Sequence, residues 1–273
     1  MTTTETAVDL KAIKQRQQQT WASGDFSVVA ARIVLVAEVL CDAADLRAGW
    51  HVLDVATGSG NAAIAAARLD CKAVGVDYVP SLLERGRRRA EAEGLAVELV
   101  EGDAEALPFP DASFDAVTSV FGTMFAPDQP RAASELLRVC RPGGTIALAS
   151  WTPDGFIGDL FRTVSEHVPP PPGVASPMLW GTEAHLRSLF GDQTRDLVTR
   201  ERTFTFRFRS AEDFVSFFRL WYGPTLKAFA GLNDIARDAL EVDLVELVRT
   251  YDRLDGEAVA VPATYLEAIA RRS

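Results

Sequence analysis

The stretch HVLDVATGSGNAA, residues 51–63, decides the fold of this chain. A short apolar run ends at a loop with glycine at positions 58 and 60, and an alanine-rich segment follows. Glycine supplies the positive φ that a tight strand-to-helix turn needs, so the stretch predicts a strand, a Gly-x-Gly turn and a helix. Ala63 completes a Gly-x-Gly-x-x-Ala pattern. That pattern is typical of a nucleotide-binding loop but does not say which nucleotide binds.

Apolar runs and helical segments alternate from residue 51 to residue 151. We predict strands at 51–56, 72–77, 96–103, 114–122 and 145–151, with helices at 61–69, 80–94 and 130–140. Strands that alternate with helices form parallel βαβ units with right-handed crossovers, and helices cover both faces of the sheet. The expected fold is therefore α/β, a doubly wound, Rossmann-like, mostly parallel sheet whose ligands bind at the carboxyl ends of the strands.

The flanking segments extend this core. Upstream we expect a helix over 7–20, a break at 23–26 and one long, mostly buried helix over 27–46 that ends near Gly49. Downstream a proline-rich connector at 168–177 precedes a helix at 182–191, a strand at 200–208, and helices at roughly 211–230 and 234–252. A final strand within 258–272 brings the sheet to seven strands.

Charge and cysteine usage narrow the function classes. The net charge is −10, and the arginine run at 85–89 is interleaved with glutamates, so we interpret it as a solvated helix face and expect no nucleic-acid partner. The three cysteines are far apart, which disfavours a disulfide framework or a zinc site, and we expect no metal. No stretch has the length of a secretion signal core or a membrane span, so the expected location is the cytoplasm.

Two acidic residues indicate the ligand. Asp77 ends the next expected strand, about 20 residues after the glycine loop, where a carboxylate accepts hydrogen bonds from both ribose hydroxyls. Asp54 precedes Gly58 by four residues. A negative charge there is unfavourable beside a pyrophosphate but suits a ligand with an ammonium group and a sulfonium, as in S-adenosylmethionine.

With these acids, VLDVATGSGNAA resembles the first motif of class I S-adenosylmethionine-dependent methyltransferases, acid-x-Gly/Ala-x-Gly-x-Gly. Asp54, Ala56, Gly58 and Gly60 fall on that pattern. The resemblance continues in order through residues 74–90, 100–125 and 135–144, and covers about 50–151. The most similar subgroup is the methyltransferase type 11 group, which includes ubiquinone and menaquinone biosynthesis methyltransferases.

The resemblance implies a role for each matching residue. Asp54 would lie near the methionine moiety, and the small residues Ala56, Gly58 and Gly60 would let the backbone approach the cofactor. Asp77 would bind the ribose, Tyr78 would flank the adenine, and Asp103 with Ala104 would bind its edge. The methionine end would be lined by Ser119, Val120 and Phe121. Asn61 and Glu105 complete this cofactor set.

The resemblance also suggests a division of the chain. Residues 1–48 would form a helical cap over the cofactor, 49–151 the S-adenosylmethionine-binding core, and 152–273 a substrate-binding extension with the last strands. Within the cap, Trp21 and Phe26 would either cover the methionine side or pack against the sheet; both readings stay open.

The sequence indicates less about the residues that bind the substrate. Aromatic residues are dense after Trp151, and we predict an apolar pocket under the helices of 211–252 that takes a hydrophobic or aromatic small molecule. The histidines, His51, His167 and His185, have no partner identifiable from sequence, so no catalytic residue is assigned. Positioning alone can supply much of the acceleration of a methyl transfer.

Two alternative functions remain at this point. A nicotinamide-dependent oxidoreductase would use the same sheet, but the spacing from Tyr222 to Lys227 is one residue too long for Tyr-x-x-x-Lys, and Asp54 opposes a pyrophosphate. A protein of the same fold that binds S-adenosylmethionine without transferring its methyl group is the other alternative. The methylated atom and the oligomeric state are open.

Overall fold

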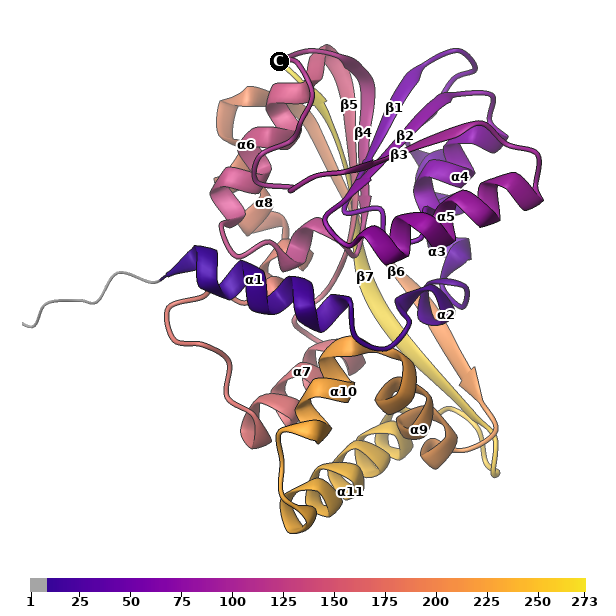
Figure 1. The fold of residues 1–273 in the computed structure, drawn as a ribbon, viewed down its shortest axis with the longest axis vertical. Helices are drawn as coiled ribbons and strands as arrows, with labels where there is room; N and C mark the ends of the chain where they lie inside the picture. Colours follow the sequence, from indigo (N-terminus) through magenta and orange to yellow (C-terminus); the bar gives the residue numbers. More distant parts are fainter. Residues whose placement is uncertain (1–8) are drawn as a thin grey trace, which may run out of the picture.

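A seven-stranded sheet forms the centre of the computed structural model, which describes residues 9–273 (Figure 1). The strands follow the spatial order β3-β2-β1-β4-β5-β7-β6. Their bounds are β1 His51–Val55, β2 Lys72–Asp77, β3 Val97–Glu101, β4 Phe114–Val120, β5 Cys140–Trp151, β6 Thr194–Phe208 and β7 Val259–Arg272. The first five strands pair in parallel, and β7 runs antiparallel to β5 and β6. The doubly wound, mostly parallel sheet is confirmed.

The position of the site follows from the strand order. From β1 the chain adds β2 and β3 on one side, and then returns to add β4 and β5 on the other. At such a switch point the connections leave in opposite directions, and a crevice opens at the carboxyl ends of the two central strands. The loops that begin at Ala56 and Phe121, after β1 and β4, border this crevice.

Helices lie on both faces of the sheet and beyond its lower end. Their bounds are α1 Leu10–Trp21, α2 Phe26–Ala30, α3 Val34–Ala43, α4 Asn61–Arg68, α5 Pro80–Ala92, α6 Gln129–Val139, α7 Phe156–His167, α8 Glu183–Phe190, α9 Ala211–Trp221, α10 Gly223–Ala230 and α11 Asp234–Tyr251. Figure 1 shows α4 and α5 on one side of the sheet and α6 and α8 on the other. Below the sheet, α7 and α9–α11 gather beside the long antiparallel pair β6 and β7, and α1 crosses in front of the strand ends.

The single helix predicted over 27–46 is wrong. The chain forms α2 and α3, separated by a turn at residues 31–33. In this turn the N–H groups of Arg32 and Ile33 donate three residues back, to the carbonyls of Val29 and Ala30, instead of four. The Asn61 side chain also donates to the Ala30 carbonyl (2.9 Å). The turn lets α2 approach the crevice while α3 packs on α4.

The helix predicted over 211–230 is also two helices, α9 and α10. Tyr222 between them has an extended backbone, with ψ 108°. Pro224 has no N–H to continue the ladder of α9, which explains the break. Two strands are longer than predicted. β6 begins at Thr194, which pairs with Arg272 of the long β7, and β5 begins at Cys140, which pairs with Phe114 of β4.

The first helix begins at Leu10, where the Asp9 carboxylate accepts from the N–H of Ala12 (3.0 Å). Residues 7 and 8 of the predicted helix lie outside the described residues.

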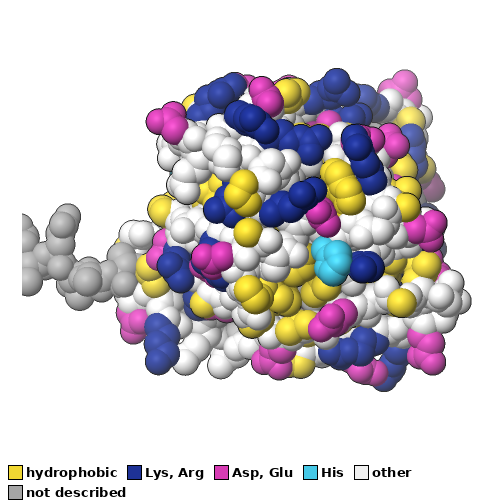
Figure 2. All heavy atoms as spheres, turned by 90° about the horizontal axis from the view of Figure 1, so that it is seen from above, with side chains coloured by type: hydrophobic (Ala, Val, Ile, Leu, Met, Phe, Trp, Pro, Cys, Tyr) yellow, Lys and Arg dark blue, Asp and Glu magenta, His cyan; other side chains and the backbone are white. Residues whose placement is uncertain are grey.

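The arginines of α5 form ion pairs and hydrogen bonds with neighbouring residues. Arg85 pairs with Asp25 (2.8 Å), Arg88 with Glu84 (3.2 Å), and Arg89 donates to the carbonyl of Ser59 (2.7 Å). Figure 2 views the end of the molecule where the parallel strands begin, and basic and acidic side chains are interspersed there. All three cysteines are free and buried. In the described part of the chain, no helix combines the length and hydropathy needed to cross a bilayer.

Candidate functional site

Asp54, near the end of β1, is buried and fixes the loop that follows it. Its carboxylate accepts hydrogen bonds from the hydroxyls of Thr57 (2.6 Å) and Thr118 (3.1 Å) and from the N–H of Ala63 (3.3 Å). Burial raises the pKa of Asp54 to about 6, although these hydrogen bonds oppose the shift. The sequence analysis did not identify these two threonines as partners of Asp54. The only available signal was that Thr57 lies three residues after the acid.

The loop after β1 keeps its shape through left-handed backbone at three positions. Ala56 has φ 53°, Gly58 φ 56° and Gly60 φ 86°. A Cβ atom on Gly58 would lie 3.5 Å from the Phe26 ring, so that ring covers the Gly58 backbone closely. Gly60 caps α4 and donates its N–H to the carbonyl of Thr57 (2.9 Å). Every second residue from 56 to 60 therefore has left-handed backbone, and the turn places backbone atoms of the loop at the crevice.

Asp77 ends β2 and bridges two loops. One carboxylate oxygen accepts from the N–H of Gly58 (2.8 Å) and the other from the N–H of Val79 (2.9 Å). Its side chain is buried, and desolvation raises its pKa to about 6 against these backbone hydrogen bonds. Each oxygen keeps a lone pair free for a further donor.

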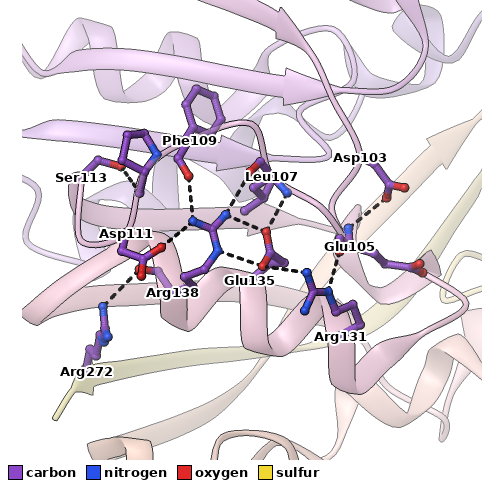
Figure 3. Close-up of polar contacts among 11 residues, drawn as sticks. Asp103, Glu105, Leu107, Phe109, Asp111, Ser113, Arg131, Glu135, Arg138 and Arg272 are labelled. Atoms are coloured by element: carbon purple, nitrogen blue, oxygen red, sulfur yellow. Dashed lines mark hydrogen bonds and ion pairs between the residues drawn. The ribbon is translucent and has the colours of Figure 1, made fainter.

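Asp103 and Glu105 lie on the loop after β3, where they meet the first helix. Lys14 of α1 forms ion pairs with Asp103 (2.6 Å) and with Glu105. Asp103 also accepts from the N–H of Glu105 (2.9 Å), and Glu105 accepts from the N–H of Asp128 (2.8 Å). The Glu105 carbonyl accepts from Arg131 Nε (2.9 Å; Figure 3). The loop is therefore held from both α1 and α6.

A second network fixes the continuation of this loop. Figure 3 shows Glu135 and Arg138 of α6 beneath it, and the buried Glu135 carboxylate accepts from the N–H of Leu107 (2.7 Å). Arg138 donates to the carbonyls of Leu107 (2.9 Å) and Phe109 (2.7 Å) and binds Glu135 through both nitrogens Nε and Nη2. The adjacent guanidinium lowers the pKa of Glu135. Glu135 and Arg138 therefore hold the backbone of the loop in place, and neither of them lines the crevice.

The cap helices, α1 and α2, close the crevice from the N-terminal side. Gln18 donates to the carbonyl of Tyr78 (2.6 Å). Trp21 and Phe26 lie edge to face, with ring centroids 5.6 Å apart. Both rings line the crevice, and their role in covering the cofactor stays a prediction.

The crevice is a cavity of about 870 Å³, here called the polar chamber. All the predicted cofactor residues line it except Gly60, which shapes the turn behind it, and Ser119, whose hydroxyl donates to the Val55 carbonyl (2.8 Å). Its lining also includes residues that the sequence did not single out: Lys14, Gln17, Ala30, Ile33, Thr57, Ala62, Leu82, Gly122, Thr123, Phe125, Ala126 and Pro127.

A second cavity of about 520 Å³, here called the apolar chamber, adjoins the first. The two chambers share Trp21, Phe26, Ile33, Phe121 and Phe125. The rest of its lining is Val29, Trp151, Ile157, Leu160, Phe161, Phe206, Phe218 and Tyr222. The Phe121 ring stacks on Trp151, with centroids 3.8 Å apart.

The predicted aromatic pocket therefore exists in part as expected. Of the aromatic residues from Trp151 onward, Trp151, Phe161, Phe206, Phe218 and Tyr222 line the apolar chamber. Phe156, Trp180, Phe214 and Phe229 are buried in the core instead. From the 211–252 region α9 and the Tyr222 junction contribute, whereas α11 does not.

The histidines lie outside both chambers. His51 is exposed at the start of β1. His167 contacts Asp243 (2.6 Å) and His185 contacts Gln129 (2.7 Å), so each has a structural partner that the sequence did not reveal. Residues 9–273 contain no cluster of three His, Cys, Asp or Glu side chains arranged to bind a metal.

Comparison with known proteins identifies relatives at two levels. Residues 52–144 match a family model described as a methyltransferase domain. The uncharacterized protein Rv1405c of Mycobacterium tuberculosis is 42% identical over 236 residues, which cover 85% of this chain and 86% of that protein. Demethylmenaquinone methyltransferase of Thermus thermophilus is 38% identical over 161 residues, covering 53% of this chain and 73% of that enzyme.

The fold also resembles a solved structure. A crystal structure of a putative methyltransferase from Bacillus halodurans superposes with a TM-score of 0.59 at 24% identity, and covers 86% of this chain and 97% of that one. At this identity the likeness concerns the fold, and it agrees with the strand order described above.

Proposed function

The chain belongs to the class I S-adenosylmethionine-dependent methyltransferases, and we propose that it methylates an apolar or aromatic small molecule held in the apolar chamber. S-adenosylmethionine is its cofactor, which sets aside the nicotinamide alternative. The observation that carries the proposal is the shared wall of the two chambers. A molecule in the apolar chamber meets a ligand of the polar chamber across Trp21, Phe26 and Phe121.

The polar chamber has the chemistry that this cofactor requires. Asp77 keeps lone pairs for two ribose hydroxyls, and we assign it that role. Asp54 supplies negative charge near the methionine end, with Asn61, Val120 and Phe121 along the wall.

At the adenine end we assign the flank to Tyr78 and the edge to Asp103, Ala104 and Glu105. Hydrogen bonds from α6 hold the loop that carries the last three from below (Figure 3). Lys14 pairs with the same Asp103 carboxylate that would accept from the adenine amine. The contact of α1 with this loop and the proposed contact of the adenine with it therefore both involve the Asp103 side chain. Ala56 and Gly58 offer backbone, while Gly60 and Ser119 support the wall from behind.

When bound, the cofactor supplies a methyl group on a positively charged sulfur that leaves readily. The residues of the chain align the acceptor and exclude water. The apolar chamber has no carboxylate, histidine, lysine or arginine in its described lining. The acceleration then comes from positioning, which is worth up to about 7–11 kcal/mol in well-oriented reactions.

Transfer from a methyl-labelled cofactor tests this proposal. Purified protein is incubated with labelled S-adenosylmethionine and metabolite extracts, and products are partitioned between organic solvent and water. We expect label in the organic phase. Label confined to water-soluble products would overturn the apolar substrate, and no labelled product from any extract would overturn the proposal itself.

A binding measurement accompanies this experiment. Calorimetry should detect S-adenosylmethionine and S-adenosylhomocysteine in the micromolar range and no binding of NADH at the same concentrations. Binding of NADH alone would contradict the cofactor assignment.

A further inference from the structure

Tyr222 lies where the two chambers meet. It follows α9 and lines the apolar chamber without lining the polar one. Its ring centroid is 5.5 Å from that of Trp21 and 6.2 Å from that of Phe26, and both of these rings border the two chambers. The side chain is therefore next to two rings that border both chambers.

The Tyr222 hydroxyl forms no hydrogen bond with any residue from 9 to 273. In that part of the chain the only side-chain nitrogen or oxygen that is sealed from open space without a partner is Trp180 Nε1. The Tyr222 hydroxyl consequently opens onto free space, and the cavity that this residue borders is the apolar chamber. Burial raises its pKa, so the hydroxyl stays neutral and can both donate and accept.

The rest of the lining sets the chemistry of the occupant. Apart from Tyr222 and the indoles of Trp21 and Trp151, every side chain that lines the apolar chamber is hydrocarbon. A polar atom of a ligand that lies beyond the reach of Tyr222 and of these two indoles would be desolvated there without a side-chain partner, at a cost of about 1–3 kcal/mol. An occupant with one polar group beside Tyr222 avoids this cost.

We propose that the Tyr222 hydroxyl binds the polar atom of the methyl acceptor, and that this acceptor is a neutral apolar molecule with a single hydrogen-bonding group such as a hydroxyl. This inference rests on the proposed methyl transfer. It makes Tyr222 the residue that orients the acceptor, and so a determinant of specificity.

The backbone holds Tyr222 in a fixed position. Its N–H donates to Phe218 (3.0 Å), and its carbonyl accepts from Leu226 (2.9 Å). The next residue, Gly223, is packed so tightly on the cap that an added Cβ would lie 2.0 Å from the Thr20 carbonyl oxygen. The ring is thus positioned relative to the same cap that covers the cofactor side, and the hydroxyl is preorganised for its ligand.

A pair of probes that differ by one hydroxyl tests the inference. Naphthalene and 1-naphthol are each titrated by calorimetry with protein saturated with S-adenosylhomocysteine. We expect wild-type protein to bind 1-naphthol about tenfold more tightly than naphthalene, as one hydrogen bond of ordinary strength provides. Tyr222→Phe should bind both probes equally, since it removes only the hydroxyl.

Tyr265→Phe is the matched control, because Tyr265 packs against Phe121 and Trp151 but does not line the apolar chamber. It should keep the tenfold preference. Equal binding of both probes to wild-type protein, an undiminished preference in Tyr222→Phe, or no binding of either probe would each overturn the inference while leaving cofactor binding intact. Failure of S-adenosylhomocysteine itself to bind would instead overturn the proposed function, and the inference with it.

Discussion

The two chambers are built in opposite ways. The polar chamber takes its four acids, Asp54, Asp77, Asp103 and Glu105, together with backbone, from strand-end loops within residues 54–62, 77–82, 103–105 and 120–127. The apolar chamber is made of side chains from segments far apart in the chain, from Trp21 of α1 to Tyr222 beyond α9. A short motif can encode the first, whereas the second exists only when distant helices and strands pack together.

Replacement of Asp77 by asparagine should produce the largest difference between ligand binding in the polar chamber and ligand binding in the apolar chamber. The variant removes a charge-assisted partner of the ribose and places an amide donor beside the N–H groups of Gly58 and Val79. We expect the affinity for S-adenosylhomocysteine, measured by calorimetry, to fall about 100-fold. The preference for 1-naphthol over naphthalene at saturating S-adenosylhomocysteine should not change.

Glu98→Gln serves as the control, since it neutralises an exposed carboxylate on the neighbouring β3. It should leave cofactor affinity at the wild-type value. Equal losses in the two variants would show that net charge, not the ribose contact, governs binding.

Gly223→Ala should instead affect both chambers. Its Cβ would meet the Thr20 carbonyl oxygen at 2.0 Å, which pushes α10 away from the cap that the chambers share. We expect the free energy of unfolding in denaturant to fall by about 2 kcal/mol, as overpacking of a tight contact costs. Affinity for S-adenosylhomocysteine and for 1-naphthol should fall together.

Gly231→Ala provides the comparison at the other end of α10. A Cβ there meets its neighbours at 3.5 Å and beyond, which is ordinary contact, and φ is −81°. Its free energy of unfolding should exceed that of the wild type by about 0.4–1 kcal/mol, because alanine lowers the entropy of the unfolded chain. If Gly223→Ala were as stable as Gly231→Ala, the cap and α10 would not form the rigid joint described above.

Acidification should weaken ligand binding in the polar chamber and leave binding in the apolar chamber unchanged. Asp54 and Asp77 both have a pKa of about 6 in the folded protein, raised from 3.8 by burial. Below pH 6 they take up protons and lose the charge that favours the cofactor. We expect the affinity for S-adenosylhomocysteine to fall about tenfold between pH 7.5 and pH 5. The binding of 1-naphthol should stay constant, because the apolar lining has no carboxylate or histidine.

The same shift acts on stability with the opposite sign. Because the folded pKa exceeds the unfolded one, the contribution of these two acids to the free energy of unfolding of the ligand-free protein is largest below about pH 4 and is lost as the pH rises through 6. Asp77→Asn should remove its part of both pH dependences. A flat cofactor affinity from pH 5 to 7.5 would contradict the assignment of these two carboxylates.

What could be predicted from the sequence follows the same division. Asp54, Asp77 and Asp103 were found because each stands at or just beyond a strand end, and parallel strands bring such ends together. Lys14 and Gln17 were missed, since a polar helix gives no local sign that one face closes a cavity. Tyr222 was one aromatic among many. Its special position depends on the break between α9 and α10, for which Gly223-Pro224 was the available signal.

The smallest expected effect concerns the strain in the loop of the polar chamber. Ala56 has φ 53°, a left-handed conformation that costs a residue with a Cβ about 1–2 kcal/mol. Ala56→Gly removes this cost but adds about 0.5–1 kcal/mol of backbone entropy to the unfolded chain. We expect a net gain of about 0.5 kcal/mol in the free energy of unfolding, measured in denaturant. Cofactor affinity should not change.

Ala112→Gly gives the reference value for that gain, because Ala112 has φ 54° in an exposed turn away from both chambers. Equal gains would mean that the methyl group of Ala56 contributes nothing beyond its strain. A loss at Ala56 alone would mean that this methyl packs favourably against Gly122, whose backbone lies so close that a Cβ there would meet the Ala56 Cβ at 2.6 Å. The wall between the loops after β1 and β4 would then be held by side-chain packing even on its polar side, and the contrast between the chambers would be one of lining rather than of construction.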